Sequence, residues 1–385
     1  MLSGDEQQNE LERQVNREQQ VERADRQASE NRSPENRSPE NRAPENRAPA
    51  SRRPSHRALV NRALVKKCIR DAQWLWLACA AAIYAFCWVR VWMVSRLDTQ
   101  RFQAIIDLLP GDWQRFTPVD MSWLVTYAGR ISLAYDEPIV VFGVSIWAIA
   151  RGSDCVSGEL NRGTLEMLLA QPLSRLQLLV TQGTVTVVGT ALLALVAWLG
   201  TWTGIQTTSI KEEVRPAWSL PFSLPIVGRE ITRPFSTPKT VYTPMTSKVE
   251  ARLFLPASVT LFSLGMMLCG VTTFVSACDR YRWRTIGIVC GAYVVQTIMK
   301  LVGMASDSWK WLTYLSVFTP YEPEEFVHLA IESPDLAWSF VKYDAAGQWA
   351  GLGPLGFDLI LVGIGYLAYM AAAVIFHRRD LPAPT

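Results

Sequence analysis

Six stretches of the chain are apolar and long enough to form helices that cross a lipid bilayer. A crossing of roughly 30 Å takes about 20 helical residues. Because only helices and closed barrels satisfy their backbone hydrogen bonds in lipid, the pattern predicts an all-α polytopic membrane protein with six transmembrane helices. The expected spans cover residues 73–94, 131–150, 178–203, 254–277, 285–304 and 355–376.

Lysine and arginine gather before the first span and after the second, fourth and sixth spans. These four places alternate with three longer segments in which basic residues are less dense, so the positive-inside rule places both termini in the cytoplasm of a cell (inner) membrane. Two large external loops are then expected at residues 204–252 and 305–353. The first of them contains several basic residues and many Pro, Ser and Thr, and its short alternating runs could pair as small strands.

Two basic residues lie inside expected spans. Arg90 and Lys300 are near the outer ends of their helices, where long side chains can snorkel to the interface, and we expect them to do so. The carboxylates of Asp136 and Glu137 stand at the start of the second span. Carboxylates are costly in lipid, so we expect this pair at the mouth of a cavity or at the interface.

The first 56 residues have a different composition, rich in Glu, Arg, Asn and Gln and nearly free of aromatics. Residues 30–49 repeat one pentapeptide four times, as ENRSP ENRSP ENRAP ENRAP. A proline at every fifth position blocks regular helix and sheet, and little apolar surface is available to bury. Residues 1–56 are therefore expected to be a disordered low-complexity tail, either a tether or a tolerated expansion.

Residues 57–71 form a basic amphipathic pattern before the first span, and residues 72–385 then contain all six spans. A basic face opposite an apolar one is typical of a helix that lies along an anionic membrane surface. The basic positions recur at four-residue steps, at Arg62, Lys66 and Arg70, opposite Val60, Leu64 and Cys68.

The segment GELNRGTLEMLLAQPLSR, residues 158–175, stands between the second and third spans and is half polar. Placed on a helical wheel, it has a charged stripe opposite a broad apolar arc, so an amphipathic helix is predicted over residues 153–172. Pro172 ends this helix and Ser174 can cap the next one. From periodicity alone, the helix could equally lie on lipid.

The stretch from Arg151 to Arg175 closely resembles the signature of ABC-2 type permeases, the membrane subunits of type V ABC transporters. The closest likeness is to the branch that includes the permease of nitrous-oxide-reductase maturation. The shared pattern is a small residue and a glutamate, then GT-L-E-LL-a-QP-sR, following the second span. The C-terminal FHRRDLPAP and the six-span plan also resemble this branch. The resemblance covers residues 65–385 and leaves the repeat tail without a counterpart.

The resemblance implies that the helix between spans two and three is a coupling helix, which docks in a groove of a separate ATP-binding subunit. The residues that it assigns to this contact are Glu159, Arg162, Gly163, Thr164, Leu165, Glu166, Leu168, Leu169, Gln171, Pro172 and Arg175. The turn with Arg280, Arg282 and Arg284 is at the position of a second cytoplasmic contact, or is a plain positive-inside anchor. Residues 57–71 are at the position of an elbow helix.

The chain has no G-x-x-x-x-G-K-[ST] phosphate loop and no Gly-Lys dipeptide. We therefore expect no cofactor, catalytic residue or metal on this chain, with ATP and Mg bound by the partner ATPase. Six spans are half of a typical translocation path, so the working exporter should contain a second permease copy or a paralogue. A net charge of +3 is too small to indicate nucleic acid.

Two other functions fit the same pattern. The chain could be a membrane anchor or assembly scaffold with the permease fold, with the loop at residues 204–252 bound to a periplasmic protein. Alternatively, Glu324, Glu325 and His328 in EPEEFVH are reminiscent of an intramembrane protease. The protease hypothesis is the weaker, because no second histidine is expected on the same side of the membrane to complete a zinc site.

Overall fold

The computed structural model describes residues 62–97, 103, 108, 119–164, 174–214, 217–224, 228–232, 239–343 and 348–379. The expected tail, residues 1–56, lies outside them. The long helices are α2 (Arg62–Arg96), α6 (Pro138–Ser153), α9 (Arg175–Thr207), α10 (Leu255–Cys278), α11 (Arg282–Ala305) and α14 (Pro354–Arg378). Short helices are α4 (Met121–Val125), α5 (Tyr127–Ser132), α7 (Glu159–Asn161), α12 (Trp311–Leu315) and α13 (Pro323–Glu332).

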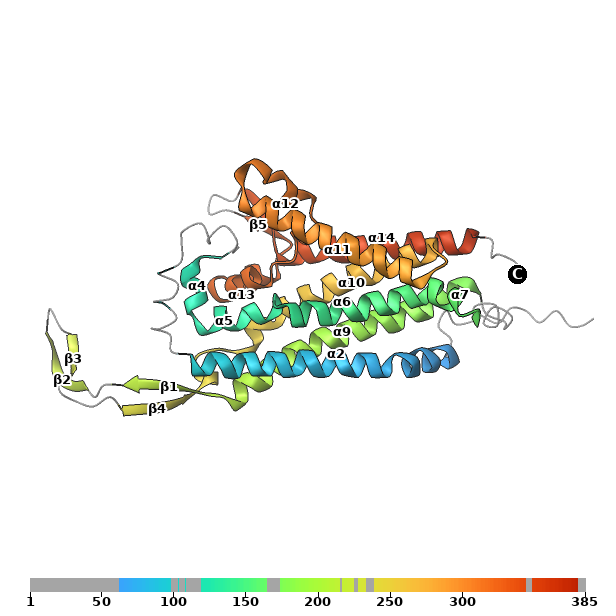
Figure 1. Cartoon of the computed structure of the whole chain (residues 1–385). Coiled ribbons are helices and arrows are strands. Elements are labelled where there is room, and N and C mark those ends of the chain that lie inside the picture. Colours follow the sequence, from blue (N-terminus) through green and yellow to red (C-terminus); the bar gives the residue numbers. More distant parts are fainter. Residues whose placement is uncertain are drawn as a thin grey trace, which may run out of the picture. The chain divides into compact units, whose positions relative to one another are not determined.

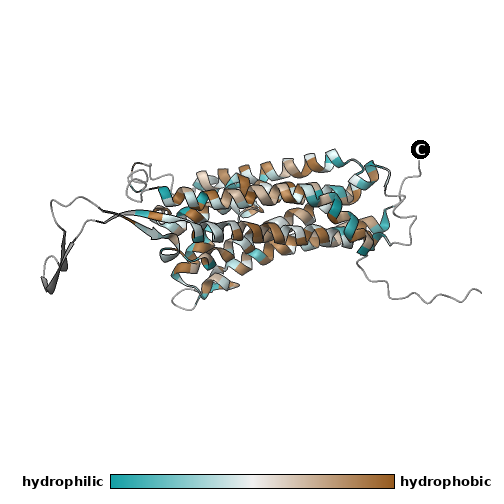
Figure 2. Cartoon of the chain, turned by 90° about the horizontal axis from the view of Figure 1, so that it is seen from below, coloured by the Kyte–Doolittle hydropathy of each residue, from teal (hydrophilic) through white to brown (hydrophobic). Residues whose placement is uncertain are grey.

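Six helical segments of this part of the chain are long and apolar enough to cross a membrane, which confirms the six predicted spans. They run side by side, with hydrophilic residues mostly near their ends (Figures 1 and 2). At one end of the bundle, α2, α9 and α11 begin, and α7, α10 and α14 stop. We call this end the α7 end. The opposite end, with α13, is the α13 end.

The predicted division between an elbow helix at 57–71 and a first span at 73–94 is wrong within the described residues. Residues 62–96 form one continuous 35-residue helix, α2. No proline or glycine occurs between Arg62 and Arg96, so nothing in the backbone interrupts the helix. A change of composition from basic to apolar is thus not a helix boundary here.

α10 is the most enclosed helix of the bundle and packs most extensively on α14, then on α6 and α9. Glycine makes the first contact possible, because a Cβ on Gly270 would lie 2.1 Å from the carbonyl oxygen of Gly365. Small residues let two helix backbones approach closely in this way. α2 packs mainly along α9.

The segment after α9 contains two antiparallel strand pairs, as its alternating pattern predicted. The strands are β1 (Ser209–Val214) with β4 (Lys239–Pro244), and β2 (Ala217–Leu224) with β3 (Gly228–Thr232). A third pair, β5 (Val341–Tyr343) and β6 (Trp349–Leu352), precedes α14. Short 3₁₀ turns link the remaining elements: η2 (Leu133–Tyr135), η4 (Met245–Ser247), η5 (Ala251–Phe254), η6 (Asp307–Trp309) and η7 (Leu336–Trp338).

Arg90 and Lys300 do not snorkel, contrary to the prediction. The Arg90 guanidinium is 3.3 Å from Glu137 Oε1 and donates to the Arg130 carbonyl at 3.2 Å. Lys300 Nζ donates to the carbonyls of Phe318 and Tyr321, at 3.0 and 3.1 Å. Each long side chain turns inward because an acceptor is available within the chain itself.

Candidate coupling site

The helix that contains α6 continues beyond the second apolar stretch. α6 passes directly into a π-turn, η3 (Asp154–Gly158), and then into α7. Within the described residues, the first part of the predicted coupling helix is therefore a continuation of the second span and not a separate helix. No proline occurs between residues 139 and 171 to separate them. π-turns of this kind are frequent at functional sites.

Ser276 of α10 holds the π-turn in place. Its hydroxyl accepts hydrogen bonds from the backbone amides of Val156 and Ser157, at 3.2 and 2.9 Å, and donates to the Ser153 carbonyl at 3.1 Å. The Ser157 hydroxyl also lies 3.2 Å from that of Thr285 on α11. The turn is thus hydrogen-bonded to two neighbouring helices, which makes it part of the bundle and not a free extension.

Gly163 stands two residues beyond the end of α7, and its φ of +68° is left-handed. Glycine is the usual residue at this position after a helix, because it has no Cβ to strain the backbone. Of the predicted coupling residues, Glu159, Arg162, Gly163, Thr164 and Arg175 are described. The others lie outside the described residues: Leu165, Glu166, Leu168, Leu169, Gln171 and Pro172.

A single carboxylate, Asp154, lies among three guanidinium groups. Its Oδ1 is 2.7 Å from Arg162 Nη1 and 3.4 Å from Arg282 Nη1, and its Oδ2 is 3.5 Å from Arg151 Nη1. The hydrogen bond with Asp154 raises the pKa of Arg162 above its ordinary value. The α6–α7 junction and the start of α11 therefore share one ion-pair network.

The helical wheel placed Glu159 on the charged stripe of the predicted coupling helix, and in the structure its side chain is buried within the chain. Only 4 % of its surface is exposed. Its Oε1 is 3.5 Å from Lys67 Nζ on α2 and 3.4 Å from Arg162 Nη2, and its other oxygen accepts from the Thr164 hydroxyl. A buried carboxylate needs such partners, and Lys67 supplies one from a helix that the wheel could not include. Glu159 thus joins α2 to the α6–α7 junction within the chain.

Arg175 links the start of α9 to the end of α14. Ser174 caps α9, as predicted, since its hydroxyl accepts from the Gln177 amide at 3.1 Å. Arg175 Nη1 donates to the carbonyls of Phe376 and Arg379, at 3.3 and 2.5 Å. These are groups at the end of a helix that lack partners within it, so the guanidinium acts as a C-terminal cap.

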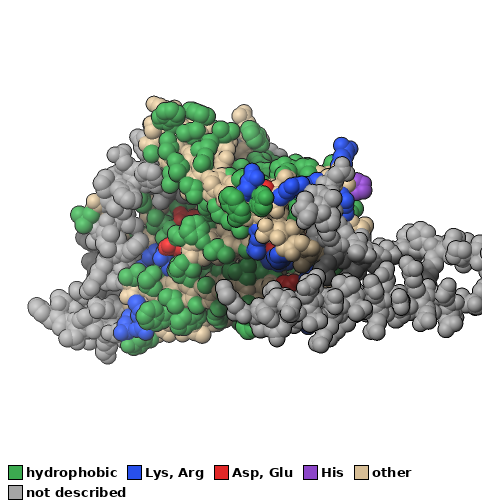
Figure 3. Space-filling view, turned by 45° about the vertical axis from the view of Figure 1, so that its right-hand side comes forward, with side chains coloured by type: hydrophobic (Ala, Val, Ile, Leu, Met, Phe, Trp, Pro, Cys, Tyr) green, Lys and Arg blue, Asp and Glu red, His purple; other side chains and the backbone are tan. Residues whose placement is uncertain are grey.

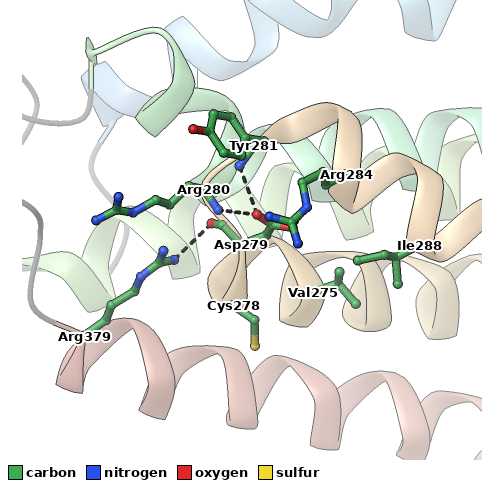
Figure 4. A pocket seen from close by; sticks show the side chains of 8 residues that line it. All are labelled: Val275, Cys278, Asp279, Arg280, Tyr281, Arg284, Ile288 and Arg379. Atoms are coloured by element: carbon green, nitrogen blue, oxygen red, sulfur yellow. Dashed lines mark hydrogen bonds and ion pairs between the residues drawn. The ribbon is translucent and has the colours of Figure 1, made fainter.

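Arg379 repeats the arrangement one helix further on. Its guanidinium donates to the carbonyls of Ala277 and Asp279, at 2.7 and 3.0 Å, and so caps the end of α10 (Figure 4). Residues 376–379 thus link the ends of α10 and α14 and the start of α9 at the α7 end of the bundle.

The predicted second contact is the turn between α10 and α11, and its three arginines have different surroundings. Arg282 turns toward the π-turn and donates to the Ala150 carbonyl at 3.3 Å. Arg284 is 3.5 Å from Asp279 Oδ2. Arg280 and Arg284 line a cavity of about 330 Å³ together with Arg379 (Figure 4). Figure 3 shows Lys and Arg side chains gathered at one end of the molecule.

The basic stripe of the predicted elbow is present at the start of α2. Arg62, Lys66 and Arg70 are exposed, while Leu64 and Cys68 are buried. The two buried side chains belong to an apolar cluster with Cys155 and other residues. The amphipathic pattern is therefore confirmed for residues 62–70, and its apolar face contacts protein.

The residues of the protease hypothesis lie at the α13 end. Glu324 is 4 % exposed, and burial together with the nearby charge of Asp136 raises its pKa to about 8. Glu325 pairs with Lys342, and the His328 ring lies edge-on to Trp123 with centroids 4.7 Å apart. No group of three or more His, Cys, Asp or Glu that could hold a metal occurs in the described ranges. The residues make structural contacts in this arrangement.

Sequence reasoning missed Asp154, Ser276, Lys67 and Arg379. The sequence offered one signal for Asp154, which is the glycine four residues later, Gly158. In the structure a Cβ on Gly158 would lie 2.3 Å from Asp154 Oδ1. The other three are remote in sequence from the segment that they hold, and no local pattern identifies them.

Two comparisons with known proteins bear on the family of the chain. No curated protein matches the chain. A family model described as "ABC-2 family transporter protein" matches residues 5–381, nearly the whole chain. The match reaches into the tail, which corrects the expectation that the tail has no counterpart. The chain therefore belongs to the ABC-2 transporter family.

Proposed function

We propose that this chain is the permease subunit of an ABC exporter, active with a separate ATP-binding subunit. In this proposal the chain forms half of an export path and pairs with a second copy or a paralogue. The α7 end faces the cytoplasm of the inner membrane, and the partner ATPase binds ATP and Mg. As a further hypothesis, the chain belongs to the branch that includes the permease of nitrous-oxide-reductase maturation, which its motif resembles. Family membership supports the permease role in general.

The observation that carries the coupling proposal is the set of contacts on both sides of residues 165–173. On one side, the π-turn is hydrogen-bonded to α10 and to α11, and Glu159 is paired with Lys67 of α2. On the other side, Arg175 holds the end of α14. A force applied to the segment between would be transmitted to the ends of all six spans.

Such transmission requires contacts that move as rigid bodies, because packed interfaces are bistable and do not deform continuously. The π-turn and the guanidinium caps meet this requirement. We therefore propose the residues between Glu159 and Arg175 as the contact with the ATPase, with Arg280 and Arg284 as a second contact. Glu159 and Arg175 act within the chain and transmit the motion.

The test is co-purification of a phosphate-loop ATP-binding subunit, sought first in the neighbouring reading frame, with full-length protein. Leu168→Asp should leave the protein inserted in the membrane, but should reduce ATPase retention at least tenfold and abolish ATP-dependent transport activity. The matched control is Leu315→Asp on α12, an exposed leucine that is 59 % accessible and far from the α7 end. It should leave both unchanged. Equal retention by Leu168→Asp and the parent chain would overturn the assignment.

The scaffold hypothesis predicts a different result. A scaffold would retain a periplasmic protein through residues 204–252 and would show no ATP-dependent flux with the ATPase bound. Measuring flux in vesicles that contain both subunits distinguishes the two functions.

A further inference from the structure

A cavity of about 440 Å³ lies at the α7 end, where α2, the end of α6, α7 and the start of α11 meet. It is separate from the cavity in Figure 4, which lies between α10, α11 and α14. Four cationic side chains line it: Lys67 of α2, Arg151 of α6, Arg282 of α11, and Arg162, which directly follows α7.

The charges around the cavity do not cancel. Three carboxylates line it, those of Asp71, Asp154 and Glu159, so four cations less three anions leave a charge of +1. The two oxygens of Asp154 lie within 3.5 Å of all three arginines, and Asp71 is on the exposed side of α2. The side chains that line the cavity together hold more N–H donors than acceptor oxygens, because each guanidinium has five donors.

Arg151 supplies the second observation. The residue is 6 % exposed and lines the cavity, yet its Nε has no hydrogen-bond partner within the part of the chain that the structure describes. A buried donor without an acceptor is unfavourable. Nε itself is almost inaccessible, so an acceptor oxygen in the cavity would reach it after a small rotation of the Arg151 side chain.

The surroundings of the cavity indicate where such an oxygen comes from. Trp74 and Trp283 are 76 % and 72 % exposed, and they stand beside the cavity-lining parts of α2 and α11 in the sequence. Exposed tryptophans in spanning helices belong to the membrane–water interface. Further along α2, Leu77 is exposed and apolar, and Leu75 lines the cavity itself. A ligand with a charged head at the interface and acyl chains along these helices matches both features.

We propose that this cavity binds the phosphate group of an anionic phospholipid. The phosphate accepts hydrogen bonds from Arg151, Arg162 and Arg282, which are suited to phosphate oxygens by their planar fork of donors. The placement in the cytoplasmic leaflet rests on the orientation given under the proposed function. The binding itself does not depend on the ATPase.

A lipid at this place would contact α2, the α6–α7 junction and α11 together. Its headgroup would lie within the ion-pair network that holds the junction. Lipid occupancy would then stiffen the segment through which the ATPase is proposed to act.

The test uses the full-length chain in detergent, without the ATPase, and native mass spectrometry to count bound lipid. Dioctanoylphosphatidylglycerol should bind one molecule per chain at saturation, in preference to dioctanoylphosphatidylcholine. Because an Arg near a membrane surface contributes about 1 kcal/mol toward an anionic lipid, Arg162→Gln and Arg282→Gln should each weaken the binding about fivefold. Arg282→Lys should retain most of it.

Arg284→Gln is the matched control, since Arg284 lies on the same helix and lines the other cavity; its side chain is 52 % exposed and that of Arg282 is 37 % exposed. It should change the affinity less than about twofold. The Arg162→Gln variant keeps the test decisive if Arg282→Gln misfolds, because the Arg162 side chain is 43 % exposed.

Three results would overturn the proposal. The first is equal binding of the two lipids by the parent chain. The second is full retention of phosphatidylglycerol by both glutamine variants. The third is saturation by inorganic phosphate alone without any preference between lipids, which would show a soluble anion site. If the parent chain binds the lipid but does not retain the ATPase, the result counts against the coupling contact in the proposed function and not against this lipid site.

Discussion

α10 and α11 are consecutive in the sequence and similar in length, but they differ sharply in their surroundings. Among the most apolar 18 residues, 72 % are buried in the span that includes α10 and only 11 % in α11. A Cβ on Gly270 of α10 would collide with backbone, whereas one on Gly287 or Gly291 of α11 would meet nothing within 4 Å. Hydropathy alone does not distinguish the two helices.

The difference teaches how each helix is held. α10 is packed along its length by α14, α6 and α9. α11 is held near its ends, by Arg282 and Thr285 at the α7 end and by Gln296 and Lys300 at the α13 end. Its exposed middle is available to lipid or to a second copy of the chain, so α10 is the scaffold of the bundle and α11 its periphery.

The largest effect should come from closing the gap between α10 and α14. Gly270→Leu forces side-chain atoms into the Gly365 carbonyl, and we expect a loss of more than about 4 kcal/mol and no folded protein. Gly291→Leu on α11 is the matched control and should cost less than about 0.5 kcal/mol. Fluorescence-detected size exclusion of the two variants measures this. Comparable peaks for both would mean that α10 is not the closely packed helix.

The anchor of α11 at the α13 end should come next. Lys300→Met leaves the carbonyls of Phe318 and Tyr321 without their donor, and we expect about 2–3 kcal/mol of destabilisation. Lys310→Met removes an exposed ammonium nearby and should have almost no effect. Thermal unfolding in detergent compares the variants, and an unchanged Tm for Lys300→Met would show that α11 needs no such anchor.

The cap on α10 should have a smaller effect. Arg379→Gln shortens the side chain that donates to the Ala277 and Asp279 carbonyls, with an expected cost of about 1–2 kcal/mol. The adjacent Arg378 is exposed, and Arg378→Gln should be neutral. Proteolysis of the α7 end in membranes should become faster for Arg379→Gln only. Equal rates for the two variants would argue against the cap.

The smallest effect should depend on pH. α13 packs on α10, and its Glu324 has a pKa raised from 4.5 to about 8, by burial first and then by the charge of Asp136. Since the folded state favours the protonated carboxyl, stability is present below pH 4.5 and is lost as the pH rises toward about 8.

Glu324→Gln cannot ionise and should remove this loss. Its Tm relative to the parent chain should therefore increase between pH 5 and pH 8. Glu332→Gln, on the exposed side of the same helix, should show a smaller change. A parallel Tm profile for Glu324→Gln and the parent chain would show that Glu324 is ionised in the folded protein.

The sequence predicted the features that depend on local pattern. The six spans, the strand pairs after α9, the Ser174 cap and the exposed stripe of Arg62, Lys66 and Arg70 all follow from periodicity, length and residue type. Prolines and polar residues in the loops indicated the approximate ends of the six spans.

The errors share one physical cause, which is partners that are distant in sequence. The inward turns of Arg90 and Lys300 depend on Glu137 and on a carbonyl pair that only the folded chain brings near. Glu159 is buried because Lys67 lies beside it, 92 residues away along the chain. A helical wheel assigns a face to a residue, but it does not say which neighbour covers that face.

The most direct test of the central claim is photo-crosslinking from the segment between α7 and α9. A benzophenone amino acid at position 168, in cells that also produce the ATPase, should crosslink to the ATPase in high yield. The same amino acid at Tyr314, which is 79 % exposed on α12, should give no such product. A position 168 that crosslinks only to this chain, or to periplasmic proteins, would contradict the account.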